Sequence, residues 1–188
     1  MPIEKSEKES LLFRTILIFA MMVLAAALRL APHPWNFAPV GAIALFSGAM
    51  VRDRRLAFLF PLLVMFATDA FIGFSKLSPV VYASFLLSVL IGRLLNEKCS
   101  FVRVGGATFL GALQFFLITN FGVWAFLSSY PRTAAGLATC YLAGVPFFWN
   151  TVAGDAVYAT LLFGGFFLAE RVAPRLRLSS VSNLDARH

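Results

Sequence analysis

Long apolar segments separated by short polar connections run through the whole chain. The segments rich in Leu, Phe, Ala and Val cover residues 11–30, 36–51, 55–74, 79–96, 102–127 and 146–168. Most of them reach the roughly 18 apolar residues that indicate a membrane-spanning helix. The second is shorter and carries Pro39 near its start, where a helix begins more easily than it continues. This pattern predicts an all-α integral membrane bundle of six transmembrane helices.

The polar segments define the rest of the predicted organisation. Residues 1–10 form a polar amino-terminal segment, residues 11–170 the transmembrane domain, and residues 171–188 a basic tail. The first apolar segment is longer than the 7–15 residues typical of a signal peptide and its leader is rich in Glu, so we expect it to be retained as a helix. The longest connection joins the last two spans, and we expect a short interfacial helix at 134–143 within it.

Composition excludes several classes of protein. Sixty per cent of the 188 residues are hydrophobic and 13% are charged, with a mean hydropathy of +0.81, which excludes an ordinary soluble domain. Six spans leave no room for a soluble catalytic domain, so function is expected inside the bundle or on its loops. Cys99 and Cys140 are too few for a disulfide framework or a zinc site, and we expect no cofactor.

Basic residues alternate between the two sides of the predicted bundle. The flanks and connections on one side hold 13 of the 16 Lys and Arg residues, namely Lys5, Lys8, Arg14, Arg52, Arg54, Arg55, Arg93, Lys98, Arg103, Arg171, Arg175, Arg177 and Arg187. The other side holds Arg29, Lys76 and Arg132. Because cytoplasmic loops are enriched in Lys and Arg, both termini are predicted to be cytoplasmic. The same distribution accounts for the net charge of +7 without a nucleic-acid partner.

Polar residues within the predicted spans concentrate toward the outer side. Asp69, Asn120, Asn150 and Asp155 all fall in the outer half of their spans, and the inner halves are almost wholly apolar. Such residues can join helices by hydrogen bonds, or they can line a cavity. For a single residue the joining role is the better interpretation, but the restriction of the whole group to one leaflet favours a cavity.

Helical spacing adds aromatic residues to this group. Asp155 and Tyr158 share a face with Thr151, and Asn120 lies one turn from Trp124. Apolar walls with a few placed polar groups suit a small organic ligand. The loop between the first two spans adds His33, Trp35 and Asn36 among prolines, although an interfacial role for Trp35 and a solvated one for His33 explain them equally well. The predicted ligand-binding residues are therefore His33, Trp35, Asn36, Asp69, Asn120, Trp124, Asn150, Asp155 and Tyr158.

Sequence signatures of catalysis are missing. The chain has no G-x-x-x-x-G-K-[ST] loop, no H-E-x-x-H and no G-x-S-x-G. Asp69 and Asp155 could form a carboxylate pair, but their spacing does not show that they meet. We therefore expect a protein that is not an enzyme and does not hydrolyse ATP by itself.

Four motifs between residues 30 and 160 carry a family resemblance. They are P-H-P-W-N-F-A-P-V-G-A-I-A-L-F at 32–46, T-D at 68–69, T-N-F-G-V-W at 119–124 and W-N-T-x-x-G-D at 149–155. These motifs resemble an uncharacterised family of bacterial six-helix membrane proteins. That family is in turn similar to the substrate-binding S components of energy-coupling factor vitamin transporters, in size, number of spans and cytoplasmic termini.

The resemblance implies uptake of a small organic nutrient across the bacterial cytoplasmic membrane. The ligand would be a vitamin or vitamin precursor, with corrinoids among the candidates, bound near the outer face; His33 or Cys140 could then ligate cobalt. S components dock a transmembrane coupling subunit with ATPases through small residues on the first helix, whereas the inner half of the first span here is bulky. A solitary transporter therefore stays open. The alternative function is a non-transporting membrane scaffold in a larger complex.

Overall fold

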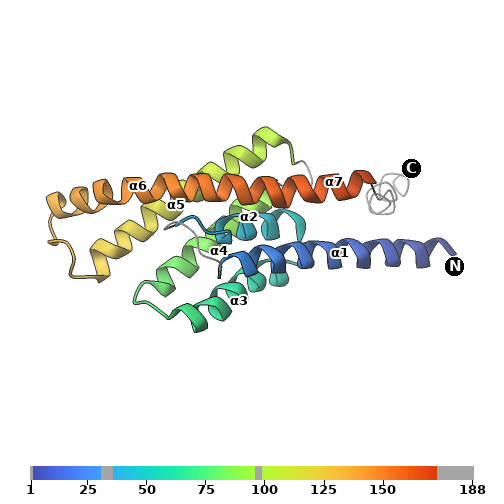
Figure 1. The fold of residues 1–188 in the computed structure, drawn as a ribbon, viewed down its shortest axis with the longest axis horizontal. Helices are drawn as coiled ribbons and strands as arrows, with labels where there is room; N and C mark the ends of the chain where they lie inside the picture. The colour runs from blue at the N-terminus through green and yellow to red at the C-terminus, as the bar shows by residue number, and fades with distance from the viewer. Residues whose placement is uncertain (1, 31–35, 96–98, 173–188) are drawn as a thin grey trace.

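The structure is a computed structural model that describes residues 2–30, 36–95 and 99–172. The helices, in chain order, are α1 (Pro2–Leu28), α2 (Val40–Met50), α3 (Arg54–Ile72), α4 (Ser78–Leu95), α5 (Phe101–Phe126), α6 (Ala134–Ala159), a π-helical segment η1 (Thr160–Gly164) and α7 (Gly165–Val172). Figure 1 shows that α1 begins and α7 ends at the same end of the bundle, which we call the terminal end. The described residues contain no strand, so the all-α prediction is confirmed.

The helices have the length and surface of a membrane bundle. Within the described residues, five are long and apolar enough to cross a bilayer: Leu11–Leu28 of α1, α3, α4, α5, and the continuous α6–η1–α7. Large apolar side chains such as Leu24 (68%), Phe71 (84%) and Leu94 (81%) are exposed on the outside of the bundle. Such a surface is unfavourable in water and favourable in lipid. The chain is a multi-pass membrane protein.

The second predicted span is a short helix at the centre of the bundle. α2 has 11 residues, nine of which are buried, and its length of about 16 Å is half of a hydrocarbon core. It contacts α1, α3, α4, α5, α6 and η1. The short helix predicted at 36–51 is therefore present, but it begins only after Pro39 and is too short to cross a bilayer by itself.

α2 and α4 cross at very short range. A Cβ atom on Gly48 of α2 would lie 2.1 Å from the carbonyl oxygen of Val89, and one on Gly92 of α4 would lie 2.1 Å from that of Leu45. Both positions therefore require glycine. Small residues at such crossings let two membrane helices touch through their backbones, which maximises van der Waals contact where no hydrophobic driving force exists.

The last predicted span begins twelve residues earlier than expected. α6 starts at Ala134, where the side chain of Thr133 accepts a hydrogen bond from the amide of Gly136, and it continues through Pro146. The separate interfacial helix predicted at 134–143 is thus the first part of α6. Proline is tolerated inside membrane helices when neighbouring groups compensate for the lost hydrogen bond. Asp155 consequently lies near the middle of a 39-residue helix and not close to its beginning.

Candidate functional site

Two adjoining cavities lie between α4, α5, α6 and the residues that lead into α2. Their volumes are about 390 Å³ and 220 Å³. Both are lined by Asn36, Val81, Phe115 and Thr151, so they meet along a common wall. Leu77 and Tyr130, next to the α3–α4 and α5–α6 connections, line the larger one. These paired cavities therefore lie toward the end of the bundle opposite the terminal end.

The larger cavity has aromatic walls. Phe115 and Phe116 of α5 and Phe147 and Phe148 of α6 line it, and the ring centroids of Phe116 and Phe148 lie 5.1 Å apart, in direct contact. Its polar lining groups are few: Asn36, Thr119, Asn120, Tyr130, Cys140 and Thr151. Apolar walls with a small number of fixed polar groups are the usual composition of a site for an organic molecule.

Asn120 is the amide at the α5–α6 wall of this cavity. Its Nδ2 donates to the carbonyl of Phe116, 2.8 Å away and one turn earlier in α5. A Cβ on Gly144 of α6 would lie 2.4 Å from the Asn120 Oδ1, so the absence of a side chain at Gly144 provides the space for the amide. The thiol of Cys140 donates to the backbone carbonyl of Asn120 at 3.4 Å. Two residues of α6 thus hold this part of α5 in place.

Asp155 lies where the smaller cavity meets the start of α2. Its Oδ1 accepts a hydrogen bond of 3.2 Å from the amide of Ala42, in the first turn of α2. Gly41 makes this possible, because a Cβ there would lie 2.4 Å from the same oxygen. A carboxylate at a helix amino terminus satisfies an amide without an intrahelical partner and interacts favourably with the helix dipole. Asp155 is 5% exposed, so this contact takes place inside the bundle.

Arg29 also lines the smaller cavity and belongs to an ion-pair network. It follows α1, and its Nη2 lies 2.7 Å from Oδ1 of Asp69 on α3. The hydroxyl of Tyr82 on α4 donates to the other oxygen of Asp69 at 2.8 Å, and Arg29 also donates to Thr68. Three helices are joined by this network, with the two charged side chains only 15% and 8% exposed. Asp69 therefore orients the guanidinium that lines the cavity.

The predicted ligand-binding residues fall into three groups. Asn36, Asn120 and Asp155 line the paired cavities. Four others lie outside the lining, namely Asp69, Trp124, Asn150 and Tyr158. His33 and Trp35 lie outside the described residues. The structure thus brings three of the predicted side chains together and places the rest in other surroundings or beyond the described chain.

The residues outside the lining have identifiable surroundings. Asp69 is held by Arg29 and Tyr82. The indole nitrogen of Trp124 donates to the carbonyl of Pro131 at 2.9 Å, which closes the α5–α6 connection. The ring of Tyr158 packs on Phe37, with centroids 5.9 Å apart. Asn150 is half-buried on α6, next to the cavity residue Thr151.

Some lining residues escaped sequence reasoning. The sequence pattern identifies Arg29 only as one of three basic residues on the less basic side, yet in the structure Arg29 lines the smaller cavity. One signal in the sequence could have indicated this role: Arg29 lies at the outer end of the first predicted span, at a membrane depth similar to that of Asp69 in the third. Asn36 takes a left-handed backbone conformation with φ of 61°, which Asn adopts more readily than most residues. This conformation turns the chain toward α2 beside both cavities.

The described residues do not form a recognisable metal-binding site. Within the parts of the chain that are described, no three His, Cys, Asp or Glu side chains form a group that could hold a metal ion. The cobalt ligation predicted for His33 involves a residue outside the described part. Cys140 is buried and engaged with the Asn120 carbonyl.

Comparison with known proteins identifies one matching family. The model of a "Family of unknown function (DUF6580)" matches residues 9–176. No curated protein and no solved structure is significantly similar to the chain.

Proposed function

Because the chain belongs to DUF6580, a family of unknown function, we propose a function from its cavities: it takes up a small organic nutrient, which binds in the paired cavities. This is the role of an S component of an energy-coupling factor transporter. The supporting observation is the pair of adjoining cavities of about 390 Å³ and 220 Å³ between α4, α5 and α6. Ligand sites of proteins commonly have volumes of about 300–1,000 Å³.

The lining suggests the chemistry of the nutrient. Phe115, Phe116, Phe147 and Phe148 favour a flat or aromatic body, and Asn120 and Thr151 offer hydrogen bonds to its edge. Arg29 and Asp155 add a cation and a carboxylate to the lining of the smaller cavity. A vitamin or vitamin precursor with a ring and one ionised group fits this combination. The volumes favour the smaller members of this class over a corrinoid.

The distribution of basic residues sets the proposed orientation. Four arginines lie toward the terminal end: Arg14, Arg52, Arg54 and Arg93. Because cytoplasmic loops are enriched in Lys and Arg, we assign the terminal end to the cytoplasmic side of a bacterial inner membrane. The paired cavities then lie toward the outside, where a nutrient arrives. Accumulation would require a partner such as a coupling subunit with ATPases, since the chain carries no P-loop; a solitary protein would equilibrate its ligand.

Mass spectrometry of small molecules retained by the purified protein tests the proposal. The wild-type protein should release a defined organic compound on denaturation. Thr151→Phe, which fills the common wall of both cavities, should abolish retention. Val157→Phe, a similar enlargement at a 47% exposed position on the same helix, should retain the compound. If none of the three proteins carries a compound, and none is retained after incubation with a vitamin mixture, the scaffold function becomes the better explanation.

A further inference from the structure

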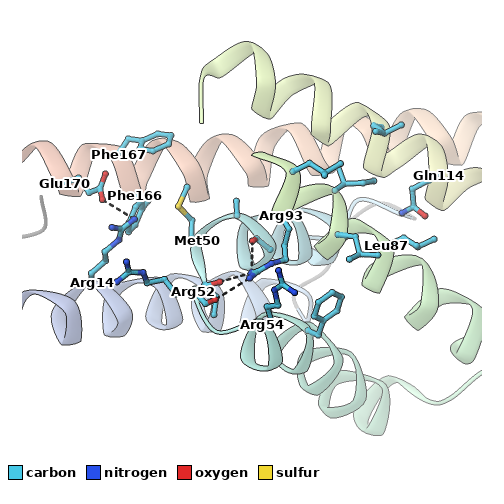
Figure 2. Close-up of a pocket in the computed structure, with 18 residues that line it drawn as sticks. Arg14, Met50, Arg52, Arg54, Leu87, Arg93, Gln114, Phe166, Phe167 and Glu170 are labelled. Carbon is cyan, nitrogen blue, oxygen red and sulfur yellow. Dashed lines mark hydrogen bonds and ion pairs between the residues drawn. The ribbon is translucent and has the colours of Figure 1, made fainter. Parts of the chain in front are cut away.

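A second recess lies at the terminal end and shares no lining residue with the paired cavities. Its volume is about 1,010 Å³, and it is bounded by α1, the turn from α2 to α3, α4, α5 and α7. Figure 2 shows Arg52, Arg54 and Arg93 around the turn between α2 and α3, with Arg14 and Glu170 on the far side. We call this recess the arginine cleft.

The cleft is strongly cationic. Four of its lining residues are Arg (Arg14, Arg52, Arg54 and Arg93), and Glu170 is its one acidic residue among those described. Glu170 lies 3.7 Å from Arg14, whose guanidinium also covers the ring of Phe166. Its charge is thus directed at one arginine, and the other three face the cleft without an acidic partner among the lining residues.

The three remaining arginines differ in how they are engaged. Arg93 donates to the carbonyls of Gly48, Val51 and Arg52, at 3.0–3.4 Å, and so closes the carboxyl end of α2. In the described part of the chain, the guanidinium groups of Arg52 and Arg54 make no hydrogen bond or ion pair, and both side chains are exposed. Two arginine forks beside a helix end are therefore available to a ligand with several anionic oxygens, such as a phosphate.

An apolar track leads away from these arginines. Leu87, Leu90 and Leu94 share one face of α4, and they are 40%, 48% and 81% exposed. Leu110 of α5, which is 47% exposed, adds to the same wall. The track extends about 10 Å along α4 into the membrane-spanning part of the bundle. A soluble anion would gain nothing from contact with this apolar wall, whereas an acyl chain could pack against it.

We propose that the arginine cleft binds an acidic phospholipid, with its phosphate on Arg52 and Arg54 and an acyl chain along the leucine track of α4. Basic recesses between membrane helices at the cytoplasmic side bind such headgroups elsewhere. The same arginines could also bind free phosphate. The leucine track favours the lipid, because only a lipid has an acyl chain to place along it. This inference does not depend on the ligand of the paired cavities.

Native mass spectrometry of the full-length protein in detergent tests the proposal, with phosphatidylglycerol and phosphatidylcholine of identical acyl chains as probes. Phosphatidylglycerol should bind and phosphatidylcholine should not compete with it. Arg52→Gln combined with Arg54→Gln should weaken binding about 30-fold, since each basic residue near an anionic lipid contributes a factor of about five. The matched control is Arg55→Gln with Arg103→Gln, which removes the same charge from exposed residues outside the cleft and should leave binding unchanged.

Three results would overturn the proposal. Equal binding of the two lipids to the wild-type protein would show that the acidic headgroup is not recognised, and this arm needs no variant to fold. An equal loss in the control pair would show that only net charge matters. Displacement of phosphatidylglycerol by millimolar inorganic phosphate would assign the arginines to a free anion.

Discussion

Asp155 of α6 and Arg93 of α4 bind opposite ends of the same short helix. The carboxylate accepts from the amide of Ala42 at the start of α2, and the guanidinium donates to the carbonyls of Gly48 and Val51 at its end. The negative group is at the positive end of the helix dipole and the positive group at the negative end. Both contacts satisfy backbone groups at the ends of α2 that have no partner within the helix.

Removing the carboxylate should therefore destabilise the bundle. We expect Asp155→Ala to lower the free energy of unfolding by about 1–2 kcal/mol, the usual cost of losing a helix cap. Asp155→Asn should lose less, because an amide oxygen can still accept from Ala42. Thermal unfolding in a fixed detergent measures both, with the lipid-facing Val157→Ala as control. Equal stability of Asp155→Ala and the wild type would show that the contact does not support the fold.

The glycine crossing predicts a large effect from a single methyl group. Gly92→Ala should destabilise the protein by about 1–3 kcal/mol or prevent its folding, because the new Cβ would overlap the Leu45 carbonyl. Gly105→Ala on α5 is the matched control, since a Cβ there meets no atom within 4 Å. The yield of monodisperse protein and its unfolding temperature distinguish the two. Similar values for both variants would contradict the crossing.

The Arg29–Asp69 pair should behave as a buried ion pair. Asp69→Leu alone should cost about 3–5 kcal/mol, because it leaves the Arg29 guanidinium without its carboxylate. The double variant Arg29→Leu with Asp69→Leu should recover most of that loss, since neither charge then remains buried. A double-mutant cycle on unfolding free energies measures the coupling. Additive losses would mean that the two groups do not interact energetically.

Cys99, which precedes α5, offers a test at the terminal end. Burial, followed by the negative charge of Glu170, raises the pKa of its thiol above the ordinary value. The thiolate is the reactive form, so alkylation at pH 8 should be slow and should accelerate as pH rises. Glu170→Gln should shift this pH profile downward and speed the reaction at pH 8, whereas Asp53→Asn should not. Both measurements use a Cys140→Ala background so that a single thiol reports.

Orientation in the membrane can be determined independently. Reporter fusions after Arg132 and at the carboxyl end should lie on opposite sides, with the carboxyl end in the cytoplasm. The reason is the concentration of Arg and Lys at the terminal end. Identical reporter signals at the two positions would exclude the proposed orientation.

The predicted spans agree with the structure where the helices are exposed to lipid. The segments 55–74, 79–96 and 102–127 match α3, α4 and α5 within a few residues, because a span exposed to lipid must be apolar over the membrane thickness. The short helix predicted at 36–51 is also present as α2 (Val40–Met50), but it is shorter than a bilayer-spanning helix because its surroundings are mostly protein. The predicted start of the last span at 146 is wrong, because Thr133 caps the helix at Ala134 and the helix continues through Pro146.

The candidate site was predictable only in part, for a related reason. Asn120 and Asp155 could be found from their depth in the spans, and Asn36 from its place in the proline-rich loop. The position of Asp69 could not, because pairing with Arg29 depends on how α1 and α3 come together over a separation of 40 residues. Depth in a span indicates that a polar residue needs a partner. It does not indicate whether that partner is another side chain or a ligand.

The crossing of α2 and α4 has a mechanical consequence. Helices that slide past one another need intervening side chains that can change rotamer, and at Gly48 and Gly92 there are none. We therefore expect α2 and α4 to move together as one rigid body. Arg93 of α4 strengthens this unit by donating hydrogen bonds to the carbonyls of Val51 and Arg52 in the α2–α3 turn. Since α5 and α6 supply most of the lining of the larger cavity, we expect a motion that opens it to move these two helices relative to the α2–α4 pair.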